Sequence, residues 1–331
     1  MMNEPLDRMV DRRAFLARAA ALATAATVGS SIALPAIAQA TTTPTGTGGT
    51  GTPVPGNWAN AYVKPRPEAM ADPTELTIAE AAWLIRANKL TPEQLVEAYL
   101  ARISAYDGIY QAFNVVVADA AIAAARAAAG QPQRSPLHGI PLAIKDNFYT
   151  EGVLTTANSF LFQDFVPPYD ATAVAQLKAN GAIVLGKTQM GPLATTRATT
   201  PAGVITTVNA WTPTNRNTNP GGSSTGTATA VAGRMATSGI GTQTGGSITS
   251  PSNAQNLTGI KPTMGRISAA GTIPLSYTRD HPGPLARDAK DAAIMLAAMA
   301  GPDPADPRSQ GLPAVPRLVD AATPVYDSGK V

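Results

Sequence analysis

The sequence contains no cysteine in its 331 residues and only two histidines, His138 and His281. The absence of cysteine excludes disulfides, thiol nucleophiles and cysteine-ligated metal sites. Neither histidine lies in an H-E-x-x-H pattern or beside a cluster of possible metal ligands, so no zinc site is predicted. His138 precedes a glycine and His281 precedes a proline, so both are predicted to be structural residues in turns rather than catalytic bases.

Charged residues are also scarce. They make up 14% of the chain, against 44% hydrophobic residues, and the formal net charge is +3. So small a positive charge gives no support for a nucleic-acid partner. The hydrophobic content is sufficient for a sizeable buried core, and the length suits one large domain or two ordinary ones.

The first forty residues have the pattern of an export signal. Paired arginines at positions 12 and 13 precede Phe15 and Leu16, and an uncharged Ala-rich stretch then leads to Ala38-Gln39-Ala40. This order is typical of a twin-arginine signal peptide with a small-x-small cleavage site. An amphipathic helix is the alternative, but no charge occurs between Arg18 and Lys64 to give it a polar face. We therefore expect a periplasmic or secreted protein.

The apolar stretch is too short and too weakly apolar to span a membrane comfortably. We expect the signal to be removed, and no stable membrane insertion is expected after its removal. Residues 41–57 consist almost entirely of Thr, Gly and Pro and are expected to form a flexible linker. The folded domain is then expected to occupy residues 58–331.

Within that domain, helical patterns alternate with short apolar runs. Thr77–Glu80 and Thr91–Gln94 are capping boxes that predict the starts of two helices. Three further helices are predicted over residues 118–129, 170–180 and 288–300. Strands are predicted over residues 140–144, 182–185 and 235–240. The alternation indicates an α/β domain whose strands are buried on both faces.

Two glycine-rich segments lie within apolar sequence: Gly221-Gly222-Ser223-Ser224-Thr225-Gly226, and residues 239–247, which end in Gly245-Gly246-Ser247. Glycines around a serine allow backbone N–H groups to converge on one point, because no Cβ blocks unusual φ values. Such a nest is what an oxyanion hole requires. The alternative is a pair of flexible Gly/Ser loops, and composition alone leaves both interpretations open.

A nucleophilic serine needs a base, and with histidine so rare the default candidate is lysine. An ordinary lysine has a pKa near 10.4, so keeping it neutral at pH 7 costs roughly 4.6 kcal/mol. Burial in apolar surroundings can supply a pKa shift of that size. Three lysines follow predicted apolar runs, namely Lys145, Lys187 and Lys261, and physical reasoning does not choose among them.

Lys187 also completes a P-loop pattern. Residues 181–188 match G-x-x-x-x-G-K-[ST] in full. In a P-loop the variable residues form a loop that cradles phosphate, whereas residues 182–185 are predicted to be a strand and Gly181 a helix C-cap. The pattern is therefore interpreted as a coincidence.

The two serine-containing segments resemble the G-G-S-S-G-G and G-T-D-T-G-G-S-I-R motifs of the amidase signature family. The resemblance continues through residues 259–266 and through Asp280, Gly283, Pro284 and Arg287, and it covers about residues 76–300. It implies an amidase signature fold, in which helices flank both faces of a mixed, twisted β-sheet. Family members are longer, so the chain is expected to lack the C-terminal part of the domain.

The resemblance assigns roles that the residues alone left open. It selects Lys145, within the segment 141–147, as the catalytic lysine. It makes Ser223, joined to Gly222 by a cis peptide bond, the bridging serine and Ser247 the nucleophile. The implied oxyanion hole consists of backbone N–H groups at Thr244, Gly245, Gly246 and Ser247. A small amide would be hydrolysed through an acyl-enzyme with no metal or organic cofactor.

The chain departs from the family pattern at several positions. Gln243 stands where the family usually has Asp, Thr249 where it often has Arg, and Thr225 where it has a small residue; Gln255 and Asn256 replace small and apolar residues. The changes at 243 and 249 resemble the peptide-amidase branch. Small carboxamides or peptide amides are therefore the expected substrates. The alternatives are a truncated non-catalytic relative and one of the subunits of the glutamine-dependent tRNA amidotransferase, which the export signal disfavours.

Overall fold

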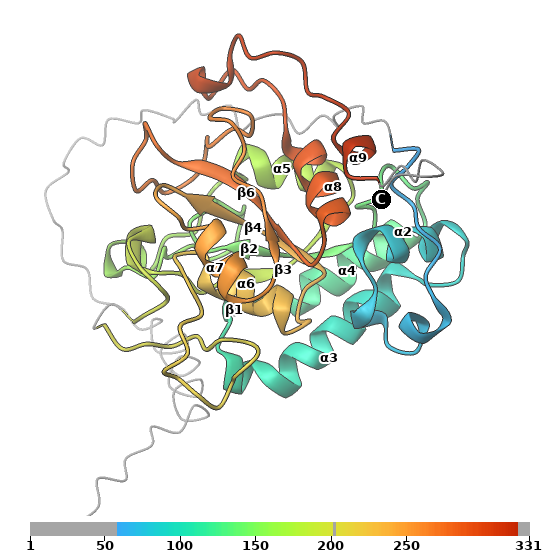
Figure 1. Cartoon of the computed structure of the whole chain (residues 1–331), viewed down its shortest axis with the longest axis horizontal. Helices are drawn as coiled ribbons and strands as arrows, with labels where there is room; N and C mark the ends of the chain where they lie inside the picture. The colour runs from blue at the N-terminus through green and yellow to red at the C-terminus, as the bar shows by residue number, and fades with distance from the viewer. Residues whose placement is uncertain (1–57, 201–202, 324–331) are drawn as a thin grey trace, which may run out of the picture. The chain divides into compact units, whose positions relative to one another are not determined.

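The computed structural model describes residues 58–200 and 203–323, which lie within one compact unit (Figure 1). The expected signal peptide at 1–40 and linker at 41–57 lie outside the described residues. In the described ranges, no helix is both long enough and apolar enough to span a membrane.

The α-helices are α2 (Ile78–Arg86), α3 (Pro92–Tyr110), α4 (Ala118–Ala129), α5 (Thr172–Ala179), α6 (Thr225–Ala232), α7 (Thr249–Ala254), α8 (Ala289–Met299) and α9 (Leu318–Ala321). The 3-10 helices are η1 (Pro67–Met70), η2 (Pro73–Glu75), η3 (Phe160–Phe162), η4 (Pro192–Ala194) and η5 (Pro307–Ser309).

The centre of the fold is a mixed six-stranded sheet in the order β1-β3-β2-β4-β6-β5. The strands are β1 (Phe113–Val116), β2 (Pro141–Lys145), β3 (Ile183–Thr188), β4 (Ser238–Gln243), β5 (Thr258–Gly259) and β6 (His281–Ala286). The central strand β2 runs parallel to both β3 and β4, while β1, β5 and β6 pair antiparallel with their neighbours. The mixed sheet predicted from the family resemblance is confirmed.

Helices cover the sheet from both sides, with α6 and α7 on one side and α5 and α8 on the other (Figure 1). Glycines allow α6 to approach β4 closely, because a Cβ at Gly239 would lie 2.6 Å from the Thr227 methyl carbon of α6. Ile240, between Gly239 and Gly241, joins a hydrophobic core that includes Ile144 of β2 and Ile294 of α8. Neighbouring residues of β4 therefore contact different layers of the fold, since Gly239 packs against α6 and Ile240 joins the core that includes α8.

The predicted helix starts are confirmed at α2 and α3. Thr77 and Thr91 each accept a hydrogen bond from the backbone N–H three residues later, and Glu80 and Gln94 accept one back from the cap residue. Helix α4 has the predicted bounds, while α5 and α8 begin and end within two residues of their predicted ends. Side-chain caps fix where α2, α3 and α8 begin, because they pair N–H groups of the first turn, whereas α4 and α5 begin without one.

A buried carboxylate joins α8 to the start of α2. Asp291 is fully buried and accepts hydrogen bonds from the N–H groups of Ile78 (2.8 Å) and Ala79 (3.2 Å). These are N–H groups that the first turn of a helix cannot satisfy internally. Burial raises the pKa of Asp291 to about 7, and the nearby charge of Asp288 acts in the same direction.

Two predictions are wrong in detail. The strand expected at 235–240 is β4 at Ser238–Gln243, because residues 235–237 form a bend and the glycine-rich sequence itself continues the strand. His281 was expected in a turn but is the first residue of β6, where its Nδ1 lies 2.6 Å from the Arg279 carbonyl oxygen. His138 does lie in a turn, as predicted.

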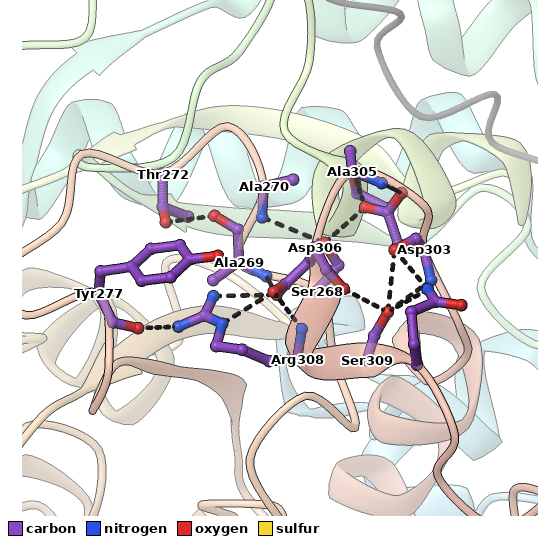
Figure 2. Close-up of polar contacts among 12 residues, drawn as sticks. Ser268, Ala269, Ala270, Thr272, Tyr277, Asp303, Ala305, Asp306, Arg308 and Ser309 are labelled. Carbon is purple, nitrogen blue, oxygen red and sulfur yellow. Dashed lines mark hydrogen bonds and ion pairs between the residues drawn. The ribbon is translucent and has the colours of Figure 1, made fainter.

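Figure 2 shows how residues 303–309 are fastened to the loop that follows residue 267. Asp303 accepts a hydrogen bond from the Ser268 hydroxyl (2.5 Å), and Asp306 accepts one from the Ala269 N–H (2.9 Å). Both aspartates are at least 95% buried. This polar network fixes a loop that, a few residues later, contacts the candidate active site.

Candidate active site

Lys145 is the last residue of β2, and its side chain is fully buried. Its amine nitrogen lies 2.9 Å from the Ser223 hydroxyl, 2.8 Å from the Thr242 hydroxyl and 3.2 Å from the Thr242 carbonyl oxygen. Ser223 comes from the loop before α6 and Thr242 from β4, so the sheet brings together three segments that are far apart in sequence.

Burial lowers the pKa of Lys145 from 10.5 to about 7, and the charge of Asp280 opposes this shift. A substantial fraction of the Lys145 side chains is therefore neutral at pH 7. An ordinary lysine would be neutral in roughly one molecule in three thousand at that pH. The structure thus supplies the neutral amine that proton abstraction requires.

The partners of the amine also suit its neutral form. A neutral amine has two N–H donors and one lone pair. The two oxygens of Thr242 can accept both N–H groups, which leaves the lone pair for the Ser223 hydroxyl proton. Asn147 holds Thr242 in place, since its amide donates to the Thr242 hydroxyl (3.1 Å) and to the Ile273 carbonyl oxygen (3.2 Å).

Ser223 is 1% exposed, and its peptide bond to Gly222 is cis, as the family resemblance implies. Its carbonyl oxygen accepts a hydrogen bond from the Gly191 N–H (3.2 Å). Gly222 has to be glycine here, because an added Cβ would lie 2.5 Å from the Cα of Arg197. The loop before α6 is therefore a packed structure and not a flexible Gly/Ser linker.

Ser247 lies in the short loop between β4 and α7 and is partly exposed. Ser223 and Ser247 line the same cavity of about 290 Å³. The loops that carry them are joined by a hydrogen bond from the Ser224 N–H to the Ser247 carbonyl oxygen (3.2 Å). The structure therefore brings the two predicted serines to one site, with Lys145 bonded to Ser223.

The side chain of Gln243 shapes the loop that carries Ser247. Its carbonyl oxygen accepts hydrogen bonds from the N–H groups of Ile248 and Thr249, each at 2.9 Å, and from the Thr249 hydroxyl at 3.2 Å. Gln243 and Thr249 are two of the positions at which the sequence departs from the family motif. The Gln243 side chain is thus hydrogen-bonded to Thr249, and we call these two residues the Gln243–Thr249 pair.

The four N–H groups predicted to form an oxyanion hole, at residues 244–247, find no acceptor among the residues that the structure describes. Thr244, Gly246 and Ser247 are partly exposed and Gly245 is exposed, so water or a ligand oxygen can reach this loop. Of these four residues, Ser247 lines the cavity that Ser223 also lines. The four N–H groups are therefore available to donate to a substrate oxygen.

The other two candidate lysines are engaged elsewhere. Lys187 is buried, and its amine donates to the Phe148 carbonyl oxygen (2.6 Å) and lies 3.4 Å from the Asp146 carboxylate. Residues 183–188 form β3, so the P-loop pattern is a strand, as predicted. Lys261 is exposed, with its amine 3.5 Å from a ring nitrogen of His281. Of the three, Lys145 alone contacts one of the predicted serines.

Thr242, Asn147 and Asp280 contribute to the site but were not singled out as site residues from the sequence. Asp280 accepts hydrogen bonds from the N–H groups of Leu275 (2.8 Å) and Ser276 (3.0 Å) and bonds the Thr244 hydroxyl, which fixes the start of the serine loop. All three lie inside or next to the recognised motifs, which is the only sequence feature that marks them.

Across residues 58–200 and 203–323, no group of three or more His, Asp or Glu side chains could hold a metal ion.

Comparisons with known proteins identify the family to which the chain is similar. The family model described as Amidase matches residues 94–330. One of the subunits of glutamyl-tRNA(Gln) amidotransferase from Anaeromyxobacter sp. (strain K) is 43% identical over 259 residues, or 77% of this chain and 51% of that protein. The peptide amidase of Stenotrophomonas maltophilia matches with a TM-score of 0.68 and 36% identity over 73% of this chain and 51% of that one. The corresponding amidotransferase subunit of Thermotoga maritima matches with a TM-score of 0.62 and 30% identity over 72% and 49%. The chain spans about half the length of these relatives.

Proposed function

The chain belongs to the amidase family, and on that premise we propose that it hydrolyses a small carboxamide or a peptide amide to the acid and ammonia or an amine. The observation that carries this proposal is the contact between the Lys145 amine and the Ser223 hydroxyl (2.9 Å), in the wall of a cavity that Ser247 also lines. This is the arrangement that a serine nucleophile needs when no histidine is available.

The proposed reaction begins with Lys145 in its neutral form. Lys145 takes the proton of Ser223, which takes the proton of Ser247 as the Ser247 oxygen attacks the amide carbonyl carbon. The negative charge that develops on the carbonyl oxygen is stabilised by the free N–H groups of residues 244–247. Ser223 then protonates the leaving nitrogen, and water releases the acid from Ser247 by the same route in reverse.

A second candidate function is that of an amidotransferase component, which the 43% identity to a glutamyl-tRNA(Gln) amidotransferase subunit favours. That protein's name implies partner subunits and a tRNA-linked reaction. The Gln243–Thr249 pair and the expected export signal favour the hydrolase instead. The two candidates differ in whether the chain alone turns over simple amides.

Ammonia release by the purified chain from a panel of carboxamides and peptide amides tests the proposal. We expect turnover by the wild-type chain, none by Ser247→Ala, and wild-type turnover by Ser104→Ala, which alters an exposed serine of α3. If the folded wild-type chain releases ammonia from free glutamine alone, the amidotransferase candidate is favoured. If it releases none from any amide, the proposal that the chain alone is an amide hydrolase is contradicted.

We also propose that the protein is exported through the twin-arginine route, on the basis of the paired arginines at 12 and 13 and the Ala38-Gln39-Ala40 site. Expression in a bacterial host should give a periplasmic or secreted protein whose N-terminus is Thr41. Changing both arginines to lysine should retain the unprocessed chain in the cytoplasm. Equal processing of the two forms would contradict the proposed route.

A further inference from the structure

The cavity beside Ser223 and Ser247 is polar throughout. Its walls consist of glycines and of serine, threonine, asparagine and arginine side chains, among them Arg197, Asn219, Ser223 and Ser247. No aliphatic or aromatic side chain lines it within the part of the chain that the structure describes. A large apolar acyl group binds unfavourably to a polar wall of this kind, because it would bury the hydroxyl groups of the wall without hydrogen-bond partners.

Arg197 is the one charged residue among the described residues that line this cavity. Its side chain is partly exposed, and its guanidinium forms no hydrogen bond or ion pair with any part of the chain that the structure describes. A guanidinium carries five N–H donors and no acceptor. The donors of Arg197 are therefore available to a ligand in the cavity.

The backbone of Arg197 is fixed relative to the nucleophile loops. The N–H of the next residue, Ala198, donates to the Thr225 hydroxyl (2.9 Å), which in turn donates to the Gly221 carbonyl oxygen (2.9 Å). On the other side, the Arg197 Cα packs directly over Gly222. Thr225, which departs from the family motif, thus anchors Arg197 next to Ser223.

We propose that Arg197 determines substrate specificity by binding a carboxylate of the substrate, so that the preferred substrates are amides that also carry a carboxylate, such as monoamides of dicarboxylic acids. This inference rests on the proposed amide hydrolysis. A planar guanidinium matches a carboxylate through two parallel hydrogen bonds, which lysine cannot reproduce. The scissile amide then lies at Ser247 while the carboxylate lies at Arg197, and both residues line one polar cavity.

The test compares matched pairs of amides that differ only in the carboxylate. Succinamate is paired with butyramide, and glutaramate with valeramide, in which a methyl group replaces the carboxylate. Ammonia release gives kcat and KM for the wild type, Arg197→Lys, Arg197→Met and Arg126→Met. Arg126 is an exposed arginine of α4, so its variant removes the same charge away from the cavity.

The wild type should prefer the anionic member of each pair. In Arg197→Met this ratio of kcat/KM should fall roughly 10- to 100-fold, mainly through KM, as expected for the loss of a charge-assisted hydrogen-bonded pair. Arg197→Lys should lie between the two, and Arg126→Met should keep the wild-type ratio. Turnover of both members without preference, or an unchanged ratio in Arg197→Met, overturns the inference and leaves amide hydrolysis standing.

A binding measurement decides the matter even without turnover. Succinamate is titrated calorimetrically into Ser247→Ala and into the same variant with Arg197→Met added. Binding that depends on Arg197 supports the inference, and binding that is absent or independent of Arg197 overturns it. Failure of every amide to be hydrolysed by the wild type would contradict the proposed function separately.

Discussion

Replacing Lys145 by methionine should change how protein stability depends on pH. The pKa of Lys145 is about 7 in the folded chain, because the amine is fully buried, and 10.5 in the unfolded chain. A lysine whose folded pKa is depressed contributes stability that is complete above the unfolded pKa and is lost as the pH falls through the folded pKa. At about 1.36 kcal/mol per pH unit, this difference corresponds to about 5 kcal/mol across the whole interval.

Chemical denaturation at pH 7.5, 8.5 and 9.5 measures the effect. The free energy of unfolding of the wild type, minus that of Lys145→Met, should rise by about 1.4 kcal/mol per pH unit, or about 2.5 kcal/mol from the first pH to the last. Constant effects of the substitution, such as lost hydrogen bonds to Ser223 and Thr242, cancel in this slope. Titration of other groups cancels as well, because both proteins contain them.

A flat difference would refute the reasoning, since it would mean that Lys145 binds the same number of protons folded and unfolded. The same pKa predicts the activity profile. Below pH 7, kcat/KM should rise about tenfold per pH unit, and it should level off near pH 8. A rate that keeps rising in proportion to hydroxide up to pH 10 would indicate an ordinary lysine.

Two further predictions concern residues outside the proposed proton relay. Gln243→Leu removes the acceptor of the Ile248 and Thr249 N–H groups and should lower kcat at least tenfold. Gln243→Glu keeps an acceptor oxygen and should retain more activity. Equal kcat values for the two variants would show that the serine loop keeps its conformation without this contact. The pKa of Asp291 is raised from 3.8 to about 7 on folding, so this group contributes stability that is present below pH 3.8 and is lost as the pH rises through about 7. The unfolding free energy of the wild type, minus that of Asp291→Asn, should therefore fall by about 2–3 kcal/mol from pH 5 to pH 8. A constant difference would contradict the raised pKa of this buried carboxyl group.

Local sequence patterns predicted the elements whose ends are fixed by neighbouring residues. The capping boxes at Thr77 and Thr91 predicted helix starts that the structure confirms, because each box satisfies its own backbone N–H groups. Strand β4 was displaced in the prediction because glycine has low strand propensity. What makes Gly241 suitable there is the close approach of the Ser224 side chain, a contact with a segment more than ten residues away that no local pattern records.

The candidate site could be predicted only in part for a similar reason. Composition and spacing pointed to serines in glycine-rich segments and to three lysines, and the family resemblance selected Lys145. The sheet order, which places β2 beside β4, brings Thr242 to the Lys145 amine. Arg197 belongs to no recognised motif, and its place in the cavity wall, packed against Gly222, is visible only in three dimensions.

Covalent labelling with a fluorophosphonate tests most directly whether Ser247 is a nucleophile activated through Ser223 and Lys145. Mass spectrometry of the digested protein should find the adduct on Ser247, with a labelling rate that rises through about pH 7. Ser247→Ala should remain unlabelled, and Lys145→Met should be labelled at least a hundredfold more slowly. An adduct on another serine, or equal labelling of wild type and Lys145→Met, would contradict the account.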